Sequence, residues 1–256
     1  MAQDSLRVYQ SINKGITEYS RVTSAVDKLY LETFELAESN AKPKWEYDVL
    51  IQFGYAFKTS NPDWALDKLI KAEALATASA ELNKTKLLLF TIGQLYQYNK
   101  QNYELASSNY LLCEKLIDQQ GAPTIAELYF ELIQVNIQLD DKEITNKYLA
   151  KCWDYTESVK NQQLLLKTAG LQLDFDKKNE DYKGIIEHSE RILPYISSDN
   201  GFRIQYTLQG SAYRSLYQFE QAIVAYNKAL TYTKNSSHYY QIYLDMAVCL
   251  QKSGDV

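Results

Sequence analysis

A repeated pattern of small and aromatic residues restricts the fold of this chain more than any other feature. The clearest copy lies between residues 206 and 230, where Gly210 and Ala222 stand on either side of a short turn near residues 216–218. Tyrosine and leucine side chains surround these two small residues at helical spacing. The copy therefore predicts two antiparallel helices that cross closely at Gly210 and Ala222.

The same pattern can be followed along the whole chain with a period of 37 to 40 residues. The first helix of each repeat contains one crossing position, and these positions are Ile16, Gly54, Gly93, Ile133, Gly170, Gly210 and Ala247. The second helix carries a trio of residues spaced four and three apart, which places them on one helical face. The trios are Leu29/Thr33/Leu36, Ala65/Leu69/Ala72, Ala106/Tyr110/Cys113, Thr145/Leu149/Cys152, Ile185/Ser189/Ile192 and Ala222/Tyr226/Ala229.

This register predicts thirteen helices, seven first and six second, in about six and a half repeats. The composition agrees, because 256 residues contain only 9 glycines and 4 prolines, whereas an all-β chain needs many more turns. Hydrophobic residues make up 46% of the chain, which is ample for a packed core. The predicted fold class is all-α.

The repeat resembles the tetratricopeptide repeat (TPR) family, in which an aromatic residue, Leu-Gly, Tyr, Ala, an aromatic and Ala recur in this order. The copy around Gly210 matches best, and the copy around Gly93 follows, with Ile92, Tyr96, Tyr103, Ala106 and Tyr110. The copies at Ile16 and Ile133 keep only the apolar spacing. The period exceeds the usual 34 residues, as in the TPR arrays of bacterial sensor kinases and transcription regulators. The resemblance implies a right-handed solenoid that binds proteins or peptides.

Residues 1–256 are expected to form a single repeat domain that is a fragment of a longer protein. In this register Gly254-Asp255 would be the turn before a further second helix, so Tyr243, Ala247 and Leu250 would lack a neighbour. Two interpretations of the first residues remain open. Ala2-Gln3-Asp4 resembles the remnant of a cleaved signal peptide, which would make the protein periplasmic. Read as it stands, the start has no targeting segment, which indicates a cytoplasmic protein.

The sequence gives no sign of catalysis, a cofactor or a metal site. Its two histidines, His188 and His238, fall in different repeats, and His188 is expected to be solvated on a second helix. The three cysteines, Cys113, Cys152 and Cys249, are dispersed and are expected to be small buried apolar residues. No phosphate-binding glycine motif or nucleophile elbow is present. We expect a protein that is not an enzyme.

Charge and hydropathy exclude two further classes of partner for this chain. The net charge is −5, with acidic and basic residues interspersed, so the concentrated basic surface that nucleic acids require is absent. No stretch approaches the 18 apolar residues of a membrane-spanning helix.

The TPR resemblance implies that the binding groove is lined by first-helix residues at −6, −3, +1, +4 and +5 from each crossing position. Amides and aromatic rings dominate this set and suit an extended peptide, because amides pair with a peptide backbone in both directions. The predicted groove residues are Tyr55, Lys58, Phe90, Gln94, Gln97, Tyr98, Phe130, Gln134, Gln138, Lys167, Asp174, Phe175, Arg214 and Lys252. The Lys-and-Asn clamp of some family members is not reproduced.

The function that follows is a non-catalytic module binding a protein or an extended peptide in its concave groove. We expect it to be the sensory or interaction region of a larger bacterial regulator, such as a sensor kinase or a transcription regulator. Two alternatives stay open. One is a cytoplasmic receptor for a short signalling peptide, and the other is a structural scaffold that makes its contacts through the convex face and the ends.

Overall fold

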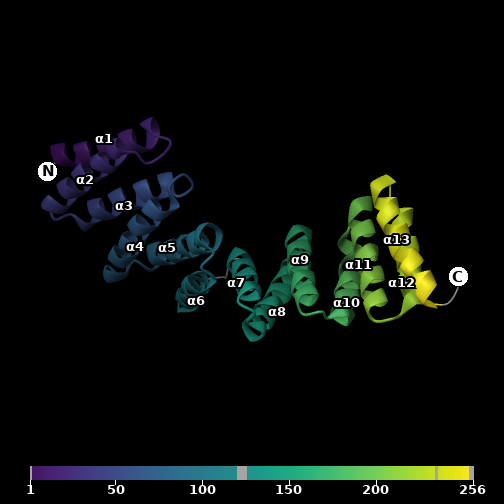
Figure 1. Ribbon diagram of the computed structural model, residues 1–256. Helices are drawn as coiled ribbons and strands as arrows, with labels where there is room; N and C mark the ends of the chain where they lie inside the picture. Colours follow the sequence, from purple (N-terminus) through teal and green to yellow (C-terminus); the bar gives the residue numbers. More distant parts are fainter. Residues whose placement is uncertain (1, 120–125, 234–235, 254–256) are drawn as a thin grey trace. The chain divides into compact units, whose positions relative to one another are not determined.

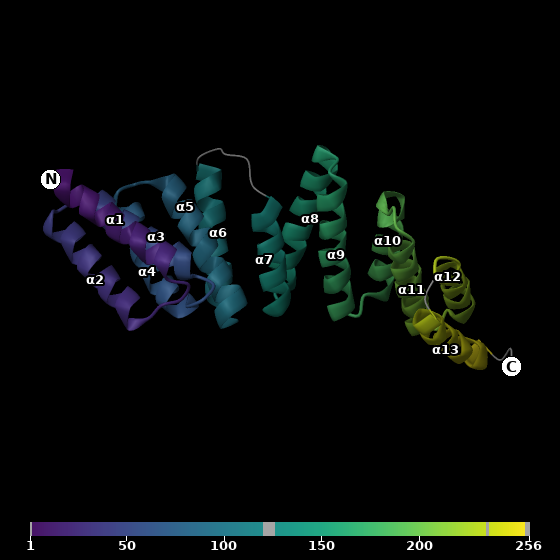
Figure 2. The ribbon, with the colours of Figure 1, turned by 90° about the horizontal axis from the view of Figure 1, so that it is seen from above.

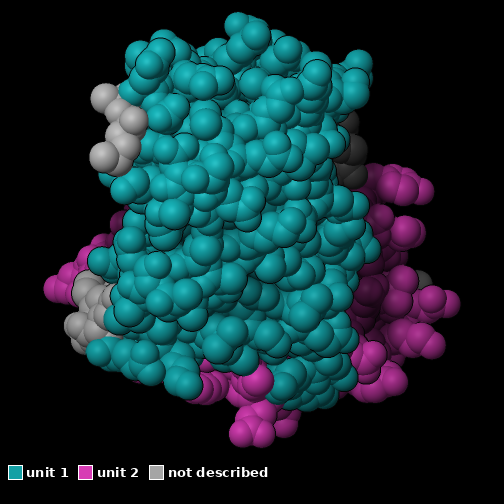
Figure 3. Space-filling model, turned by 90° about the vertical axis from the view of Figure 1, so that its left-hand side faces the viewer, with its two compact units in different colours: residues 1–142 teal, residues 143–256 magenta. Residues whose placement is uncertain are grey.

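The computed structural model describes residues 2–119, 126–233 and 236–253. These residues form thirteen α-helices, one π-helical turn and one 3-10 turn, and contain no strand. The predicted helix count and all-α class are therefore confirmed. The chain divides into two compact units, residues 1–142 and residues 143–256 (Figure 3). The division falls between the two helices of the repeat at Ile133, one of the copies that keep only the apolar spacing. The expectation of a single domain over residues 1–256 remains a prediction.

The first unit, called unit 1, contains seven α-helices packed in chain order, with α3 contacting α1, α2 and α4 (Figure 1). Proline occupies the first turn of two of them, Pro43 in α3 and Pro62 in α4, where its missing N–H leaves no helical bond unmade. The elements of unit 1 are α1 (Ala2–Glu18), α2 (Ser24–Ser39), α3 (Pro43–Phe57), α4 (Pro62–Ala78), α5 (Leu82–Leu95), the π-helical turn η1 (Tyr96–Lys100), α6 (Tyr103–Gln119) and α7 (Ala126–Gln138).

The second unit, called unit 2, contains the remaining six α-helices, among which α11 packs against α10, α12 and α13 (Figure 2). The elements of unit 2 are α8 (Lys142–Val159), α9 (Gln162–Lys178), α10 (Tyr182–Ile192), the 3-10 turn η2 (Leu193–Tyr195), α11 (Asp199–Ser215), α12 (Phe219–Thr231) and α13 (Ser236–Ser253). The expected turn at Gly254-Asp255 lies outside the described residues.

Glycine at three crossing positions lies directly against the central residue of the facing trio, as the register predicts. A Cβ atom added to Gly93 would lie 2.5 Å from Cε1 of Tyr110, and one added to Gly210 would lie 2.6 Å from Cε1 of Tyr226. At Gly54 the facing atom is Cδ2 of Leu69, at 2.7 Å. No real Cβ fits at such distances, so glycine is what allows each helix pair to pack this closely.

Gly170 does not follow this pattern, and the expectation that it marks a close crossing is wrong. A Cβ atom at Gly170 would have no neighbour within 4 Å, and the residue is exposed on α9. The trio that the register sets opposite it has Ser189 at its centre, where the other three repeats have tyrosine or leucine. A serine side chain is too short to fill that space.

Most of the described turns between helices contain one residue in the left-handed backbone conformation, and in these turns that residue is not glycine. Asp140, Glu180 and Tyr217 are three examples, with φ of 58°, 55° and 60°. The next amide closes each helix, as when the N–H of Gln218 donates to the carbonyl of Tyr213 at 2.9 Å. The chain can therefore make tight turns with few glycines, at a cost of about 1–2 kcal/mol for each such residue.

Aromatic rings form the centre of the unit 1 core. The ring of Phe53, fully buried in α3, lies 5.6 Å from that of Tyr30, 6.4 Å from that of Phe57 and 6.2 Å from that of Trp64. The ammonium of Lys68, a residue only 8% exposed, lies 4.4 Å from the Tyr30 centroid. The fold of α1–α4 therefore depends on a cluster in which α3 supplies the central ring.

A buried polar chain joins α8, α9 and α10 in unit 2. The indole of Trp153 donates to Gln172 at 3.3 Å, and the amide of Gln172 donates to Asp176 at 2.9 Å. The other carboxylate oxygen of Asp176, which is 3% exposed, lies 2.7 Å from Nδ1 of His188. The expectation of a solvated His188 is therefore wrong, because its imidazole is half-buried and paired.

The pairing of His188 predicts a pH-dependent stability for unit 2. The hydrogen bond to Asp176 raises the pKa of His188 against the opposing effect of burial. A histidine whose folded pKa is raised stabilises the fold fully below its unfolded value of about 6.5, and the contribution disappears as the pH rises through the folded pKa. We expect the free energy of unfolding to fall over this range.

Denaturant titrations between about pH 5 and about pH 8 measure this effect in the range where histidine titrates. The His188→Gln variant removes the titrating group and should lose this part of the pH dependence. An identical pH profile in both proteins would contradict the assigned pairing.

Candidate functional site

Side chains of the first helices in unit 1 form a ladder of polar contacts from α1 to α7. The Tyr9 hydroxyl donates to Asp48 at 2.5 Å, and the hydroxyl oxygens of Tyr55 and Thr91 lie 3.2 Å apart. Farther along, Glu131 accepts from the amide of Gln94 at 3.3 Å and from the hydroxyl of Tyr98 at 2.6 Å, and Gln97 donates to Gln134 at 3.2 Å. These bonds hold neighbouring first helices at fixed spacing and orient the side chains of this face.

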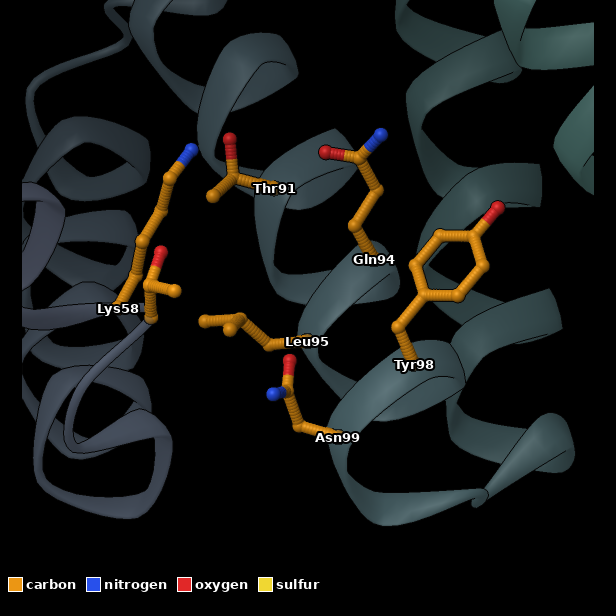
Figure 4. A pocket seen from close by; sticks show the side chains of 7 residues that line it. Lys58, Thr91, Gln94, Leu95, Tyr98 and Asn99 are labelled. Carbon is orange, nitrogen blue, oxygen red and sulfur yellow. The ribbon is translucent and has the colours of Figure 1, made fainter.

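A pocket of about 250 Å³ opens on the same face between the end of α3 and the α5–η1 segment (Figure 4). Figure 4 shows Lys58 on one side of the pocket and Gln94, Leu95 and Asn99 on the other. The residues that line it are Lys58, Thr59, Thr91, Gln94, Leu95, Tyr98 and Asn99. The pocket therefore combines one ammonium, two amides and hydroxyls with an apolar contact at Leu95.

The π-helical turn η1 positions two of these side chains. A π-helix inserts one extra residue into a helix and occurs frequently at functional sites. Tyr98 and Asn99 lie in this turn, which ends at Gln101 in the left-handed conformation. Below them Gln97, only 6% exposed, accepts from the buried Tyr110 hydroxyl at 2.7 Å. The buried bond between Tyr110 and Gln97 thus holds the turn in place, while the side chains of Tyr98 and Asn99 line the pocket.

Lys58 and Tyr98 give the pocket its chemical character. The Tyr98 side chain is 58% exposed although its hydroxyl is held by Glu131, so the apolar ring is presented to solvent in a fixed orientation. Burial, followed by the bond to Glu131 and its charge, raises the pKa of Tyr98. The Lys58 ammonium lies 5.4 Å from the Tyr55 ring centroid and, among the described residues, has no carboxylate partner. A ring and a cation without a carboxylate partner among the described residues therefore face the same small cavity.

The structure brings some of the predicted groove residues of unit 1 together and buries others. Lys58, Gln94 and Tyr98 line the pocket, and Tyr55 and Gln134 belong to the ladder beside it. The exposed Gln138 lies at the end of α7.

Two predicted groove residues of unit 1 are buried in its interior, and a third is half-buried. Phe130, at 1% exposure, is a core residue, and its assignment to the groove is wrong. The side chain of Gln97 is buried and accepts a hydrogen bond from the Tyr110 hydroxyl. The half-buried ring of Phe90 lies 5.7 Å from the Tyr110 ring.

The predicted groove residues of unit 2 form no comparable cluster. Lys167 and Asp174 are exposed on α9, and Asp174 lies 3.5 Å from Lys177. Phe175 is 9% exposed and largely unavailable to a ligand. Arg214 pairs with Asp245 at 2.6 Å, and Lys252 is exposed on α13.

Four pocket residues and three further ladder residues were not predicted: Thr59, Thr91, Leu95, Asn99, Tyr9, Asp48 and Glu131. Thr91 and Glu131 stand two residues before their crossing positions, whereas the projection used the position three residues before. The −2 position lies one turn before the +1 residues Gln94 and Gln134, so a helical projection from those amides could have found it.

Two other kinds of site have no candidate in the described parts of the chain. No group of three or more His, Cys, Asp or Glu side chains there could hold a metal ion. None of the helices within residues 2–119, 126–233 and 236–253 combines the length and apolar character needed to cross a membrane.

Comparison with known proteins gave results at the level of structure. No family model matches the sequence, and no curated protein matches it. Among solved structures, apo NprR, a quorum sensor from B. thuringiensis, has a TM-score of 0.55 at 14% identity, covering 100% of this chain and 73% of that chain. BtubC from P. vanneervenii has a TM-score of 0.56 at 13% identity, covering 88% of this chain and 90% of that chain.

A third structure decides the type of repeat. It is PH0952 from Pyrococcus horikoshii, a signal-transduction ATPase with a tetratricopeptide repeat sensor, with a TM-score of 0.55 at 14% identity. The alignment covers 98% of this chain and 37% of that chain. The fold is that of tetratricopeptide repeat proteins. The TPR register read from the glycines therefore agrees with both the helix pairs and the structural neighbours.

Proposed function

We propose that this TPR chain is a non-catalytic module that binds an extended peptide or protein segment on the first-helix face of unit 1. The main support is the pocket beside η1, where the exposed Tyr98 ring and the Lys58 ammonium, which has no carboxylate partner among the described residues, face one cavity. Aromatic side chains held in a fixed orientation are favourable binding residues because little conformational entropy is lost when a ligand covers them.

The polar ladder supports the same proposal. The amides and carboxylate of Gln94, Gln134 and Glu131 are already oriented by bonds between neighbouring helices. A peptide that lies along this face can exchange water for these groups without reordering them. The face therefore offers both apolar contact and hydrogen bonds to a backbone, which is what an extended segment requires.

The wider role that we propose is the sensory or interaction region of a larger bacterial regulator, a sensor kinase or a transcription regulator. NprR is named as a quorum sensor and PH0952 as carrying a TPR sensor, so two proteins with this fold have sensing roles. A peptide-signal receptor would use the same face. A structural scaffold would instead make its contacts through the convex face and the ends.

A random-peptide phage library selected on the immobilised protein tests the proposal. We expect selected peptides to bind wild type and to lose about 1–2 kcal/mol of binding free energy on Tyr98→Ala, as for removal of a partly buried ring. Tyr98→Phe keeps the ring and removes only the hydroxyl bonds to Glu131 and Gln134, so it should retain most of the affinity. Titration by fluorescence polarisation measures all three proteins.

Tyr217→Ala is the matched control, because Tyr217 is 82% exposed and lies in the turn between α11 and α12 of unit 2. It should leave the affinity unchanged. Circular dichroism establishes that each variant is folded. Selected peptides that bind Tyr98→Ala as tightly as wild type would contradict the proposal.

A further inference from the structure

A second pocket lies in unit 2, and its lining comes from two second helices and one first helix. It has a volume of about 300 Å³ and lies over α11 between α10 and α12. Its lining includes Glu190 of α10, Gln209 and Tyr213 of α11, and Glu220, Val224 and Lys228 of α12. All three helices belong to one compact unit, and α11 packs against both of the others.

The pocket contains a buried amide group whose nitrogen has no hydrogen-bond partner in the part of the chain that the structure describes. Gln209 is only 5% exposed, and its Nε2 atom has no hydrogen-bond partner among the described residues. Two further buried polar atoms are also unpaired: Oε1 of Gln205, one turn earlier on α11, and Oγ of Ser189, which precedes Glu190 on α10. Leaving a buried donor unsatisfied is costly, so such groups are rare in folded proteins and point to a missing partner. A ligand oxygen in the pocket would satisfy the Gln209 amide.

The charged residues of the lining indicate the charge of the ligand that this pocket would bind. The carboxylates of Glu190 and Glu220 have no ion-pair partner among the described residues, whereas the only cation in the lining is Lys228. The ammonium of Lys228 is placed 5.5 Å from the ring centroid of Tyr206. Burial and the nearby charge of Glu190 raise the pKa of Tyr213, which is consistent with a carboxylate close to that hydroxyl. Two acids against one base favour a cationic ligand.

The pocket also has an apolar wall. The side chain of Val224 is 56% exposed, and the Tyr213 ring and Ala225 lie beside it in the lining. An alkyl chain laid along this wall would remove apolar surface from water. The combination required of a ligand is thus a cation at the end of an alkyl chain and a hydrogen-bond acceptor near Gln209.

We propose that this pocket binds a lysine or arginine side chain together with the carbonyl group of the same residue. The cation pairs with Glu190 and Glu220, the alkyl chain packs on Val224, and the Gln209 amide donates to the carbonyl. The site is separate from the pocket beside η1, so it stands or falls independently of the proposed function. The residue can come from a small basic amino-acid derivative or from a basic segment of a protein.

Titration with capped amino acids tests the proposal without a known partner. The probes are the Nα-acetyl, N-methylamide derivatives of lysine and arginine, and the control is the same derivative of norleucine, which has a similar length and no charge. Shifts in nuclear magnetic resonance spectra at millimolar probe should saturate for the basic probes. The norleucine probe should bind at least about tenfold more weakly, since it lacks a charge-assisted hydrogen bond.

Variants place the binding in this pocket. Glu190→Gln should weaken binding of the lysine probe about tenfold, and Gln209→Met, which keeps the side-chain length, should weaken it by a smaller factor. Asp154→Asn removes a comparable exposed charge from α8 of the same unit and should have no effect. Binding of the basic probes should also weaken as the salt concentration rises.

A peptide with one central arginine flanked by glycine and serine distinguishes the two sources of ligand. Tighter binding of the peptide than of the capped arginine indicates a protein segment, and equal binding indicates a small basic ligand. Either result supports the site. Equal binding of norleucine and lysine probes, an unchanged affinity in Glu190→Gln, or no saturation by either basic probe would overturn the proposal.

Discussion

Replacing Gly93 by alanine is expected to destabilise unit 1 by about 1–3 kcal/mol, although alanine is the better helix former by about 1 kcal/mol. The added Cβ would lie 2.5 Å from Cε1 of Tyr110. That ring cannot move aside easily, because it is fully buried and its hydroxyl donates to Gln97 at 2.7 Å. Overpacking therefore outweighs the gain in helix propensity.

Gly170→Ala is the matched comparison, since Gly170 also lies within a first helix but has open space where the Cβ would stand. Here only the propensity term remains, and we expect stabilisation of up to about 1 kcal/mol. Urea denaturation of both variants measures the difference. Changes of the same sign in the two variants would contradict the assigned crossing at Gly93.

Truncation of Phe53 to alanine is expected to cost about 3–5 kcal/mol, the largest effect that we predict for a single substitution. The ring contacts Tyr30, Phe57 and Trp64, and it also covers Gly15, whose added Cβ would lie 2.6 Å from Cε1 of Phe53. Its removal would leave a cavity among α1, α2, α3 and α4.

Hydrogen exchange measured by mass spectrometry locates this loss along the chain. In Phe53→Ala, the amides of α1–α4 should exchange faster, because repeat units depend chiefly on their neighbours. Leu31→Ala provides the control, since Leu31 is 49% exposed on α2 and its truncation should cost no more than about 0.5 kcal/mol. Equal effects of the two truncations would show that Phe53 is not central to the core.

The helix pairs could be predicted from the sequence because the close crossings need glycine opposite a large residue. Gly54, Gly93 and Gly210 therefore identified the repeat, and Leu69, Tyr110 and Tyr226 fixed the phase of the second helices. The pattern failed at Gly170, where periodicity alone could not reveal that the facing Ser189 leaves space. A crossing position indicates close packing only when its partner is bulky.

The candidate site was less predictable because small shifts in helical phase decide which side chains reach the surface. Projection from the crossing positions found Lys58, Gln94 and Tyr98 but also selected Phe130, which the core buries. The π-helical turn adds one residue before the left-handed Gln101. The left-handed residue Gln101 lies eight positions after the crossing residue Gly93, whereas the corresponding left-handed residue Tyr217 lies seven positions after Gly210. Nothing in the composition of residues 96–100 specifies this insertion.

The pocket of unit 2 could not be predicted from the repeat, because it depends on three-dimensional contacts between helices of adjacent repeats. Gln209 immediately precedes a crossing glycine, a position that the pattern treats as structural. What points to a ligand is that its Nε2 atom is buried without a hydrogen-bond partner among the described residues.

The central claim, that unit 1 binds an extended segment on its first-helix face, is tested most directly by photo-crosslinking. A library-selected peptide carrying a photoreactive group is irradiated in complex with the wild-type protein, and the attachment sites are mapped by mass spectrometry. We expect attachment to α3, α5 and η1, near Lys58, Gln94 and Tyr98. Attachment confined to α2, α4 and α6 would contradict it and favour the scaffold alternative.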